Sequence, residues 1–517
     1  MKIVGLSFGS HDSAYAIFEN GKLLIHEELE RHSRIKECDG DVIQFYIDRH
    51  GSFDDVDIVT YFPHGNTKVF PNKWSIIENL RETGKIKLIE VGHQQGHAAN
   101  AFFSSNFSKS LIITIDGGGW DRVNKNLAPS CWSVWLGENT KIKPVEFSFD
   151  WNPGVAWQTV TSKIFKMCGG GPPNGCQAGT VMAMAALGNK NKYYDDLQTK
   201  GDIWNNNFPW NEYSSLSEQE KFDFAASFQK FTEDKLKHEM SRWITDETEY
   251  LCLSGGTVLN SVFTGKIWDW FPQLKDIYIP PVPYDAGLAI GCGQYVIHHL
   301  QNNPRITWKD NATPYLGVTY SENDVREAIS RYDNLTHTQT NNSKICDLLI
   351  DEKIVSVYGG GSESGRRALG NRSIIADPRN SNMKDIVNEK VKHRQWFRPF
   401  APSIMREEVI NWFTRDVNSP YMGFVLHFKE EQKNKVPAVV HLDGTARLQT
   451  VTKNDNKWYY SFLSEWKEKT SVPIILNTSF NDREPIVEKP EHAIDCFLKT
   501  NIDYLYFFDY GILVKKK

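Results

Sequence analysis

The stretch SLIITIDGGGWD, residues 110–121, decides the fold class, because an apolar strand runs directly into an acidic residue and three glycines. The N-terminus repeats this pattern in KIVGLSFGSHD, residues 2–12. More alternating strands follow each stretch, and Asn20-Gly21 is a strong signal for a two-residue hairpin turn. The repetition predicts a duplicated α/β domain with a phosphate-binding turn in each half.

That layout is typical of the actin-like ATPase fold. Helical patterns follow at residues 157–168, 179–188 and 219–244, and a polar segment at Thr340–Lys344 interrupts the chain. A chain of 517 residues is too long for one hydrophobic core. We therefore expect an actin-like domain at 1–342 and a second α/β domain at 343–517.

Composition bounds the class of protein. With 40% hydrophobic and 24% charged residues, the chain is typical of a soluble globular protein. It has no apolar run near the ~20 residues that span a bilayer, so no membrane partner is expected. No signal-peptide pattern is seen, and the eight cysteines form no C-x-x-C pair, so we expect a cytoplasmic protein. The net charge of -5 disfavours a protein coated in nucleic acid.

A basic segment at residues 365–402 stands out against that charge. Nine Lys or Arg and three Asp or Glu lie between Gly365 and Phe400. Gly359–Gly361 and Gly365 would let backbone N–H groups approach a small anion. Three arginines offer planar forks for phosphate, and three aromatics would hold the cations on a rigid wall: Arg366, Arg367 and Arg372, with Trp396, Phe397 and Phe400. The alternative is a solvated charged helix.

A second constellation has the composition of a metal site. His93 and His97 stand one helical turn apart, so both imidazoles can face one point. Asp116 ends an apolar strand, and Asp285 sits at a strand-to-helix turn. Two imidazoles and two carboxylates suit a divalent first-row metal, but the spacing does not choose between Fe²⁺, Zn²⁺ and Mn²⁺. The alternative is a pair of surface histidines.

Two further turns are candidates for chemistry. His11-Asp12 follows the first strand, where a histidine could take a proton from a hydroxyl, or could only bond to the backbone. Gly255-Gly256 with Asn260 forms a strand-to-helix turn that could pack against a nucleotide. Gly118, in the glycine run of the second half, is a further nucleotide-binding candidate.

Several motifs together resemble one family, the O-carbamoyltransferases of the nodulation and antibiotic-tailoring type. They are GLSFGSHDSA, GHQQGHAANAFF, IDGGGWD, SGGTVLN, PYDAGLAIG, RRALGNRSIIADPR, VKHRQWFRPFAP, HLDGTARLQT and ILNTSFNDREPIV. The resemblance covers nearly the whole chain in the same order. It implies an N-terminal domain similar to actin-like threonylcarbamoyl-transferases, followed by a domain similar to the YrdC type that forms carbamoyl-adenylate.

The resemblance also implies a reaction. Carbamoyl phosphate and ATP, with Mg²⁺, would form carbamoyl-adenylate in the second domain, and a hydroxyl of the acceptor would attack it in the first. Carbamoyl phosphate would be held by Arg367, Lys392, Arg398, Arg447, Asn477 and Ser479. His93, His97, Asp116 and Asp285 would bind Fe²⁺, and His11, with Asp12, would serve as the base. Gly118, Gly255, Gly256 and Asn260 would contact the nucleotide, and a homodimer is plausible.

The chain departs from the family pattern at three places, one of which is the slightly altered segment Glu28–Lys36. Arg366 replaces a proline of the usual motif, and Ala178–Gly188 lacks the usual acidic and basic side chains. These departures put the choice of acceptor in doubt. The acceptor could be a small molecule or sugar, or a hydroxymethylated nucleotide or nucleic acid. A non-transferring metal-binding actin-like protein is the third interpretation.

Overall fold

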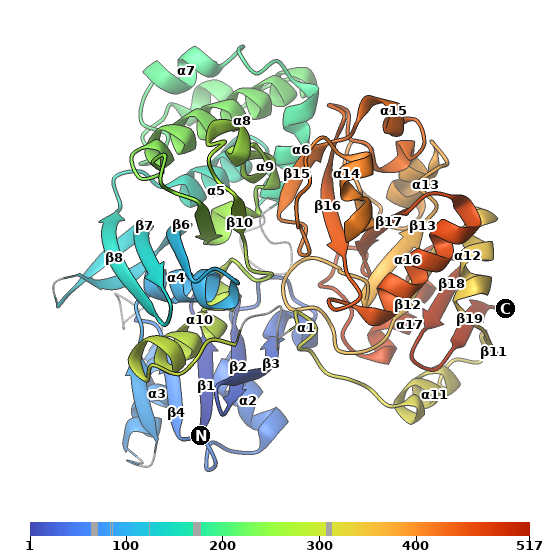
Figure 1. The fold of residues 1–517 in the computed structure, drawn as a ribbon, viewed down its shortest axis with the longest axis horizontal. Helices are drawn as coiled ribbons and strands as arrows, with labels where there is room; N and C mark the ends of the chain where they lie inside the picture. The colour runs from blue at the N-terminus through green and yellow to red at the C-terminus, as the bar shows by residue number, and fades with distance from the viewer. Residues whose placement is uncertain (64–70, 83, 85, 124, 169–176, 307–312) are drawn as a thin grey trace. The chain divides into compact units, whose positions relative to one another are not determined.

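The computed structural model describes residues 1–517 apart from 64–70, 83, 85, 124, 169–176 and 307–312 (Figure 1). The chain divides into two compact units. Unit 1 comprises Met1–Asn260 and Lys266–Pro314, and unit 2 comprises Ser261–Gly265 and Tyr315–Lys517. Helices and strands occur in both units, which confirms the α/β class.

The first sheet of unit 1 has the strand order β3-β2-β1-β4-β5. β1 pairs antiparallel with β2 and parallel with β4. The β2–β3 hairpin turns at Asn20-Gly21 as the sequence predicts, and both residues have positive φ, 50° and 85°. The strands are β1 (Lys2–Ser7), β2 (Ala14–Glu19), β3 (Lys22–Glu28), β4 (Ile58–Tyr61) and β5 (Lys87–Glu90).

The second sheet of unit 1 repeats this order as β8-β7-β6-β9-β10. β6 pairs antiparallel with β7 and parallel with β9, so the strand directions are also repeated. The predicted duplication is therefore confirmed, and the unit has the actin-like fold. The strands are β6 (Lys109–Val123), β7 (Asn126–Glu138), β8 (Lys141–Ser148), β9 (Tyr250–Ser254) and β10 (Asp276–Tyr278).

Two helices join the sheets of unit 1. α4 (His93–Ser104) packs against β6 of the second sheet, and α10 (Leu288–Gln294) packs against β1 of the first (Figure 1). The helices also pack on each other at two glycines. A Cβ atom on Gly291 would lie 1.9 Å from the carbonyl oxygen of Gly96, so this contact has no room for a side chain. The close approach brings the start of α4 next to the turn before α10.

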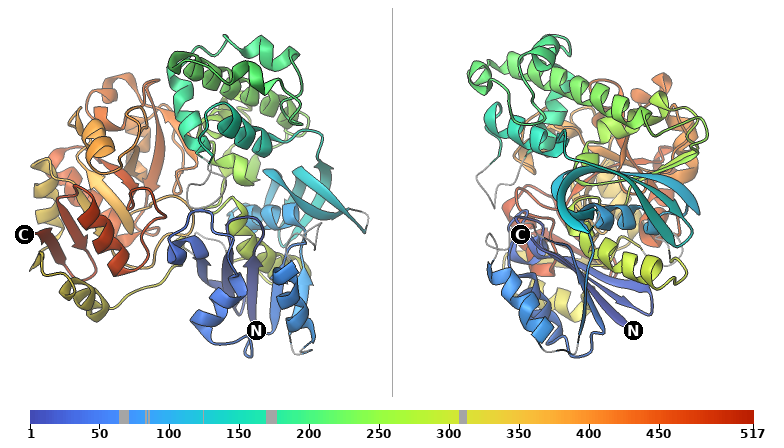
Figure 2. Two further views of the ribbon diagram at one scale, coloured as in Figure 1. Left: turned by 180° about the vertical axis from the view of Figure 1, so that it is seen from behind. Right: turned by 90° about the vertical axis from the view of Figure 1, so that its left-hand side faces the viewer.

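The other helices of unit 1 cover the outer faces and form a helical region beside the second sheet (Figure 2). In that region α6 and η1, which correspond to the departure at Ala178–Gly188, pack against α8. The helices are α1 (Leu29–Ser33), α2 (Val42–His50), α3 (Pro71–Glu82), α5 (Pro153–Lys163), α6 (Ala178–Met184), η1 (Ala185–Leu187), α7 (Tyr194–Thr199), η2 (Trp210–Tyr213), α8 (Glu218–Ser241), η3 (Gly256–Leu259), α9 (Ser261–Trp270), η4 (Asp285–Gly287) and η5 (Tyr295–Leu300). The first turn of α9, Ser261–Gly265, is grouped with unit 2.

Unit 2 is built on one mixed sheet with the strand order β11-β19-β18-β12-β13-β17-β14-β16-β15. Its centre is antiparallel, because β13 pairs antiparallel with both β12 and β17. The strands are β11 (Leu335–Gln339), β12 (Val355–Tyr358), β13 (Arg372–Ala376), β14 (Ala401–Met405), β15 (Phe424–His427), β16 (Thr445–Val451), β17 (Ile474–Ser479), β18 (Tyr504–Phe507) and β19 (Ile512–Lys516).

The main core of unit 2 lies where α12 and α16 cover this sheet. Trp466 of α16 is fully buried there, and its indole N–H donates to the carbonyl of Ile474 at 2.8 Å. The helices of the unit are α11 (Glu322–Ser330), α12 (Asn342–Ile350), α13 (Met383–Lys390), η6 (Arg406–Glu408), α14 (Val409–Trp412), α15 (Glu430–Lys433), η7 (Pro437–Val439), α16 (Lys457–Thr470) and α17 (Pro490–Lys499). Across the described residues, no helix combines the length and the apolar character that a membrane crossing needs.

The boundary between the units differs from the expected one at residue 342. It falls at Pro314, because the segment that follows already belongs to unit 2 and contributes β11 to its sheet. β11 pairs antiparallel with β19 along its whole length, and α11 packs against α17. The polar residues at Thr340–Lys344 are a connection between β11 and α12 within unit 2.

The glycine contact between α4 and α10 generates a prediction. The change Gly291→Ala should destabilise unit 1 by about 1–3 kcal/mol, because the added Cβ meets a backbone carbonyl that cannot turn aside. A lower midpoint of thermal denaturation would report this loss. Gly179→Ala is the matched control, since no described atom lies within 4 Å of its Cβ position. Equal midpoints for Gly291→Ala and wild type would contradict the tight contact.

Candidate metal centre and anion site

The four residues predicted as metal ligands meet in unit 1. Their ligand atoms all lie within 4.8 Å of one another: His93, His97, Asp116 and Asp285. The Nε2 of His93 is 2.9 Å from Asp116 Oδ2 and 3.7 Å from Asp285 Oδ1. The Nε2 of His97 is 3.6 Å and 3.5 Å from the same two oxygens. We call these four residues the metal cluster.

The geometry of the metal cluster fits a first-row divalent cation. Ligand atoms about 2.1 Å from one ion lie about 3.0 to 3.4 Å apart in octahedral or tetrahedral coordination. The distances of 2.9–3.7 Å bracket that range. The His97 ring is fully buried, and its Nε2 has no hydrogen-bond partner of good geometry. A buried nitrogen without a hydrogen bond that faces two carboxylates is in a suitable position to bind a metal ion together with them.

The pKa values in the metal cluster reflect the attraction between its imidazoles and its carboxylates. Burial alone would lower the pKa of His97, but Asp116 and Asp285 raise it to about 9. Burial alone would raise the pKa of Asp116, but the hydrogen bond from His93 and the nearby His97 imidazole hold it well below its usual value. A bound cation takes the place of the imidazole protons, because histidine binds a metal in its neutral form.

Outer contacts hold two of the ligands in place. The backbone N–H of Gly256 donates to Asp116 Oδ1 at 2.9 Å, and the Ser254 hydroxyl lies 3.4 Å from His97 Nδ1. The turn after β9 is tight at Gly255, whose φ is +97° and whose Cβ would stand 2.2 Å from the carbonyl oxygen of Ile115. Two of the predicted nucleotide-binding glycines therefore lie directly beside the metal cluster.

The other two predicted nucleotide contacts sit in different surroundings. Asn260 exchanges hydrogen bonds with Gln229 of α8, at 2.9 and 3.3 Å. Gly118 has φ of +125° and lies beside the side chains of Phe149 and Asn152. Asn152 also donates to the carbonyl of the preceding Gly117 at 2.7 Å.

The sequence pattern missed Asp121, the residue that aims α4. Its carboxylate accepts from the N–H groups of Gln94 and Gln95 at 3.1 and 3.2 Å, and from the Ser130 hydroxyl at 2.7 Å. A carboxylate satisfies the free N–H groups of a helix start and complements its dipole. His93 is the first residue of that helix, so Asp121 positions it. Asp121 is the last residue of the IDGGGWD motif, so the sequence did contain a pointer to it.

His11 and Asp12 lie at the edge of the metal cluster. His11 Nδ1 is 2.9 Å from Asp12 Oδ2, and its Nε2 is 3.8 Å from Asp285 Oδ2. The His11 side chain is 49% exposed, whereas Asp12 is buried with φ of 56°. Burial would lower the pKa of His11, but Asp12 and the other carboxylates raise it to about 10. The predicted pair is therefore brought to the predicted metal ligands.

Unit 2 gathers four arginines, which we call the arginine cluster: Arg367, Arg394, Arg398 and Arg447. Burial lowers the pKa of Arg447 well below its usual value, and the positive charges of the other three lower it further. Among the described residues, no carboxylate lies within 4.0 Å of Arg394, Arg398 or Arg447. Clustered guanidinium groups of this kind are stabilised by a bound anion.

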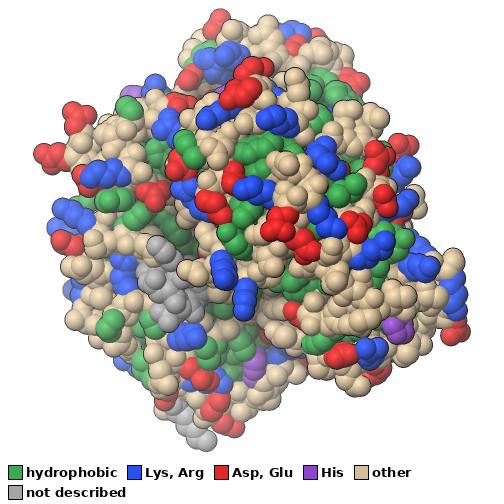
Figure 3. Space-filling view, turned by 45° about the vertical axis from the view of Figure 1, so that its right-hand side comes forward, with side chains coloured by type: hydrophobic (Ala, Val, Ile, Leu, Met, Phe, Trp, Pro, Cys, Tyr) green, Lys and Arg blue, Asp and Glu red, His purple; other side chains and the backbone are tan. Residues whose placement is uncertain are grey.

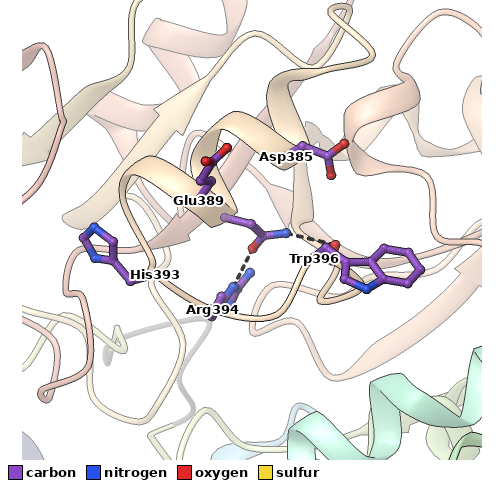
Figure 4. Close-up of a pocket in the computed structure, with 6 residues that line it drawn as sticks. Asp385, Glu389, His393, Arg394 and Trp396 are labelled. Atoms are coloured by element: carbon purple, nitrogen blue, oxygen red, sulfur yellow. Dashed lines mark hydrogen bonds between the residues drawn. The ribbon is translucent and has the colours of Figure 1, made fainter. Parts of the chain in front are cut away.

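Arg394 was missed as a site residue, although it stands in the motif VKHRQWFRPFAP. Its guanidinium packs 4.5 Å from the ring centre of Phe400, and its Nε donates to Asn388 at 2.7 Å (Figure 4). The expected aromatic wall behind the cations is therefore present at Phe400. Trp396, expected in the same wall, is 54% exposed.

Asn477 connects the elements that carry the arginine cluster. Its Nδ2 donates to the carbonyl of Ala368, beside Arg367, at 3.0 Å and to Gln449 Oε1 at 2.9 Å. Gln449 lies two residues after Arg447 on β16, so both side chains share one face of the strand. The Asn477 side chain is buried, and its Oδ1 has no hydrogen-bond partner in the described structure.

Lys392 and Ser479 also meet, as the resemblance implies. The ammonium group donates to the backbone carbonyls of Ser479 at 2.9 Å and Asn481 at 2.6 Å, and to the Ser479 hydroxyl at 3.3 Å. Lys392 lies in the same loop as Arg394 and Arg398, between α13 and β14. It therefore ties that loop to the end of β17.

Arg372 is not a phosphate fork, contrary to the expectation. It is fully buried, and it donates to the carbonyls of Gly359 at 2.6 Å and Gly360 at 3.1 Å. Its guanidinium also stacks 3.7 Å from the ring centre of Tyr358. Gly359 and Gly360 thus present carbonyl oxygens to an arginine of the chain, and the Gly361 carbonyl accepts from the Asn371 side chain at 2.9 Å. The loop is organised by Glu363, another residue that the sequence pattern missed, which accepts from the N–H groups of Leu369, Asn371 and Arg372.

Comparison with known proteins identifies the family of the chain. The family model described as Carbamoyltransferase N-terminus matches residues 64–293, and the one described as Carbamoyltransferase C-terminus matches residues 346–515. Nodulation protein NolO of Bradyrhizobium diazoefficiens is 32% identical, over 80% of this chain and 77% of that protein. Nodulation protein NolNO of Sinorhizobium fredii is 30% identical, over 98% of this chain and 79% of that protein. An uncharacterized protein of Synechocystis is 30% identical, over 97% and 95%.

The chain belongs to the carbamoyltransferase family, and it is a carbamoyltransferase enzyme. Among solved structures, HypF from T. kodakarensis aligns over 60% of this chain and 48% of that chain, with 15% identity and a TM-score of 0.38. That overlap is too small to establish a shared fold. The actin-like fold of unit 1 follows from its own strand order.

The metal cluster predicts a loss of metal on a single change. His97→Ala should weaken binding of a divalent metal by more than the roughly 10- to 100-fold that loss of an outer contact costs. Anaerobic equilibrium dialysis against Fe²⁺, Zn²⁺ and Mn²⁺, followed by elemental analysis, would measure this. His337→Ala, an exposed histidine of β11, is the control. Equal metal content in His97→Ala and wild type would exclude the cluster as the binding site.

Proposed function

We propose that the chain is an ATP-dependent O-carbamoyltransferase that moves the carbamoyl group of carbamoyl phosphate, through carbamoyl-adenylate, to an acceptor hydroxyl. Family membership establishes carbamoyl transfer. The donor, the nucleotide and the intermediate belong to the proposal. They are supported by two separate sites, an arginine cluster in unit 2 and a metal cluster in unit 1.

One observation carries the choice of donor. The arginine cluster fits an anion, and the buried Asn477 Oδ1 beside it needs a hydrogen-bond donor. The Asn477 amide cannot turn over without losing its bond to the Ala368 carbonyl, so the orientation of Oδ1 is fixed. Carbamoyl phosphate has both complements, a phosphate group and an –NH₂ group. An acyl phosphate that ends in a methyl group would leave Oδ1 unpaired.

The proposed first reaction takes place in unit 2. Carbamoyl phosphate, ATP and one water yield carbamoyl-adenylate, inorganic phosphate and pyrophosphate. Arg367, Arg398 and Arg447 would hold the phosphate of the donor and stabilise the charge that develops on the leaving groups. Lys392, Ser479 and Asn477 would complete the donor site, and Mg²⁺ would accompany ATP.

The proposed second reaction takes place in unit 1. The acceptor oxygen attacks the carbonyl carbon of carbamoyl-adenylate, the bond to the adenylate oxygen breaks, and AMP leaves. His11, oriented by its hydrogen bond to Asp12, would receive the hydroxyl proton. The metal held by the metal cluster, Fe²⁺ in our proposal, supplies polarisation of a phosphate or carbonyl oxygen when bound. Gly118, Gly255, Gly256 and Asn260 would line the nucleotide side.

The acceptor in this proposal is a small molecule or sugar with a hydroxyl group. Figure 3 shows Lys and Arg side chains interspersed with Asp and Glu over the face in view, without a continuous basic stripe. Together with the net charge of -5, this face does not favour a nucleic-acid acceptor. Incubation with ATP, carbamoyl phosphate and a panel of hydroxyl compounds, read by mass spectrometry, would identify the acceptor.

The arginine cluster generates a prediction for the first reaction. Arg447→Ala should lower kcat/KM for carbamoyl phosphate about 10- to 150-fold, the loss of one charged hydrogen bond of about 1.5–3 kcal/mol. The measurement is the release of pyrophosphate that requires both ATP and carbamoyl phosphate. Arg331→Ala, which removes an exposed ion pair of unit 2, is the control. Unchanged release by Arg447→Ala would sink the assignment of the donor site.

The fixed Asn477 oxygen generates a second prediction, which needs no variant. The inhibition constant of acetyl phosphate for the wild-type enzyme should be at least about tenfold higher than the KM for carbamoyl phosphate, because the methyl group of acetyl phosphate cannot donate to Oδ1. Competition in the pyrophosphate-release assay would give the inhibition constant. Equal affinities for the two compounds would show that Asn477 Oδ1 does not accept a hydrogen bond from the –NH₂ group of carbamoyl phosphate.

A further inference from the structure

The turn that carries Asp285 is held by side chains to which no role has been assigned above. Asp285 is the first residue of η4, and its neighbours Tyr284 and Ala286 are both buried. Each of these three consecutive residues makes a hydrogen bond with a side chain of the first sheet. The turn belongs to the second half of unit 1, so these bonds connect the two halves beside the metal cluster.

The first of these bonds comes from the end of β1. The Ser7 hydroxyl donates to the backbone carbonyl of Asp285 at 2.7 Å. Ser7 is the last residue of β1 and is fully buried. Because the loop after β1 carries His11, this bond also joins the loop of the proposed base to the backbone of a metal ligand.

The other two bonds come from the end of β3. His26 Nε2 lies 3.0 Å from the carbonyl oxygen of Ala286, and a carbonyl only accepts, so this nitrogen carries a ring proton. The Tyr284 hydroxyl donates to Glu28 Oε2 at 2.5 Å. His26 and Glu28 are two residues apart on one strand, so both side chains lie on the same face of the first sheet. Both are buried.

The topology of the first sheet explains why these residues meet at one place. β1 and β3 both pair antiparallel with β2, so they run in the same direction and end at the same edge of the sheet. η4 contacts β1 and β2. The turn of Asp285 is therefore held at its own backbone and at the residue on each side.

Asp285 depends on this support more than Asp116 does. The Asp116 carboxylate accepts from the backbone N–H of Gly256. The described residues supply no such N–H or hydroxyl bond to the Asp285 carboxylate. Its polar partners among them are imidazoles, His93 and His97 at 3.7 and 3.5 Å and His11 at 3.8 Å. The position of this carboxylate therefore follows from the backbone of its turn.

We propose that Tyr284 and Glu28, assisted by Ser7 and His26, are positioning residues that hold Asp285 in the metal cluster. The Tyr284–Glu28 bond is the shortest of the three and the one that a single conservative change removes. The inference rests on the metal binding that is part of the proposed function. It adds the residues that set how tightly the cation is held.

A role in stability alone is the alternative, because buried polar groups are hydrogen-bonded throughout proteins. Such a role predicts a loss of stability without a specific effect on the cation. The placement of the bonds favours positioning, since they meet at three consecutive residues and the middle one is the metal ligand.

Tyr284→Phe in the full-length protein tests the inference, because it removes the hydroxyl and keeps the ring. We expect its affinity for Zn²⁺ and Fe²⁺ to fall about 10- to 100-fold, the cost of losing an outer contact of a metal site. Anaerobic competition with a chelator measures the affinity. The visible absorption of the Co²⁺-loaded protein is a second measurement, and it should differ from wild type because it depends on the arrangement of the ligands.

Tyr213→Phe is the matched control. Tyr213 is buried to the same 3%, and its hydroxyl donates to Asp196 at 2.7 Å in the helical region of unit 1. This variant loses an equivalent bond to a carboxylate, and its metal affinity and Co²⁺ spectrum should match those of wild type.

Two changes at Glu28 test the partner. Glu28→Gln keeps an oxygen that accepts from the Tyr284 hydroxyl, so it should bind metal more tightly than Glu28→Ala does. Adding Tyr284→Phe to Glu28→Ala should weaken binding no further, because both changes remove the same bond.

Metal affinity of Tyr284→Phe equal to wild type would overturn the inference, and so would an equal loss in Tyr284→Phe and Tyr213→Phe. If wild type binds none of these cations, the metal cluster itself fails and the inference falls with it. Retained binding in wild type and in Tyr284→Phe would instead reject only the positioning role.

Discussion

The contact between Gly96 of α4 and Gly291 of α10 is the constraint on which unit 1 depends. Each helix covers the sheet of the other half, so this single crossing holds the two halves in register. Because both helices approach without side chains at the crossing, the start of α4 reaches the turn that carries Asp285. The metal cluster therefore depends on the close packing of the backbones of α4 and α10.

The two sites solve opposite electrostatic problems. In unit 1 one buried and one half-buried carboxylate face two buried imidazoles, a set that a cation completes. In unit 2 half-buried guanidinium groups repel one another, a set that an anion completes. Each arrangement is costly in isolation, because buried charge is stable only when it is compensated. The proposed reaction, in which a phosphate compound is activated in unit 2 and its carbonyl group is transferred in unit 1, would use both kinds of site.

Much of this organisation could be predicted from the sequence, and the failures have physical reasons. The repeated strands, the Asn20-Gly21 turn and the metal cluster follow from local patterns and from residue types that leave few alternatives. The sequence could not show that Arg372 is structural while Arg394 belongs to the arginine cluster. Composition does not say which arginine will donate to backbone carbonyls of the fold. The boundary was misplaced because β11 joins its sheet through β19, the last strand of the chain. Asp121 and Glu363 act on backbone N–H groups, which leave no mark in a pattern of side chains.

The duplication of unit 1 has a consequence for how its metal cluster can be assembled. His93 and His97 follow the first sheet, whereas Asp116 and Asp285 belong to the second half, so each copy contributes only one pair of ligands. Neither half could bind the ion with the full set, and 192 residues separate the first ligand from the last. A bound cation would therefore link the two halves of the duplicated domain. Its retention would report that both halves have closed on each other.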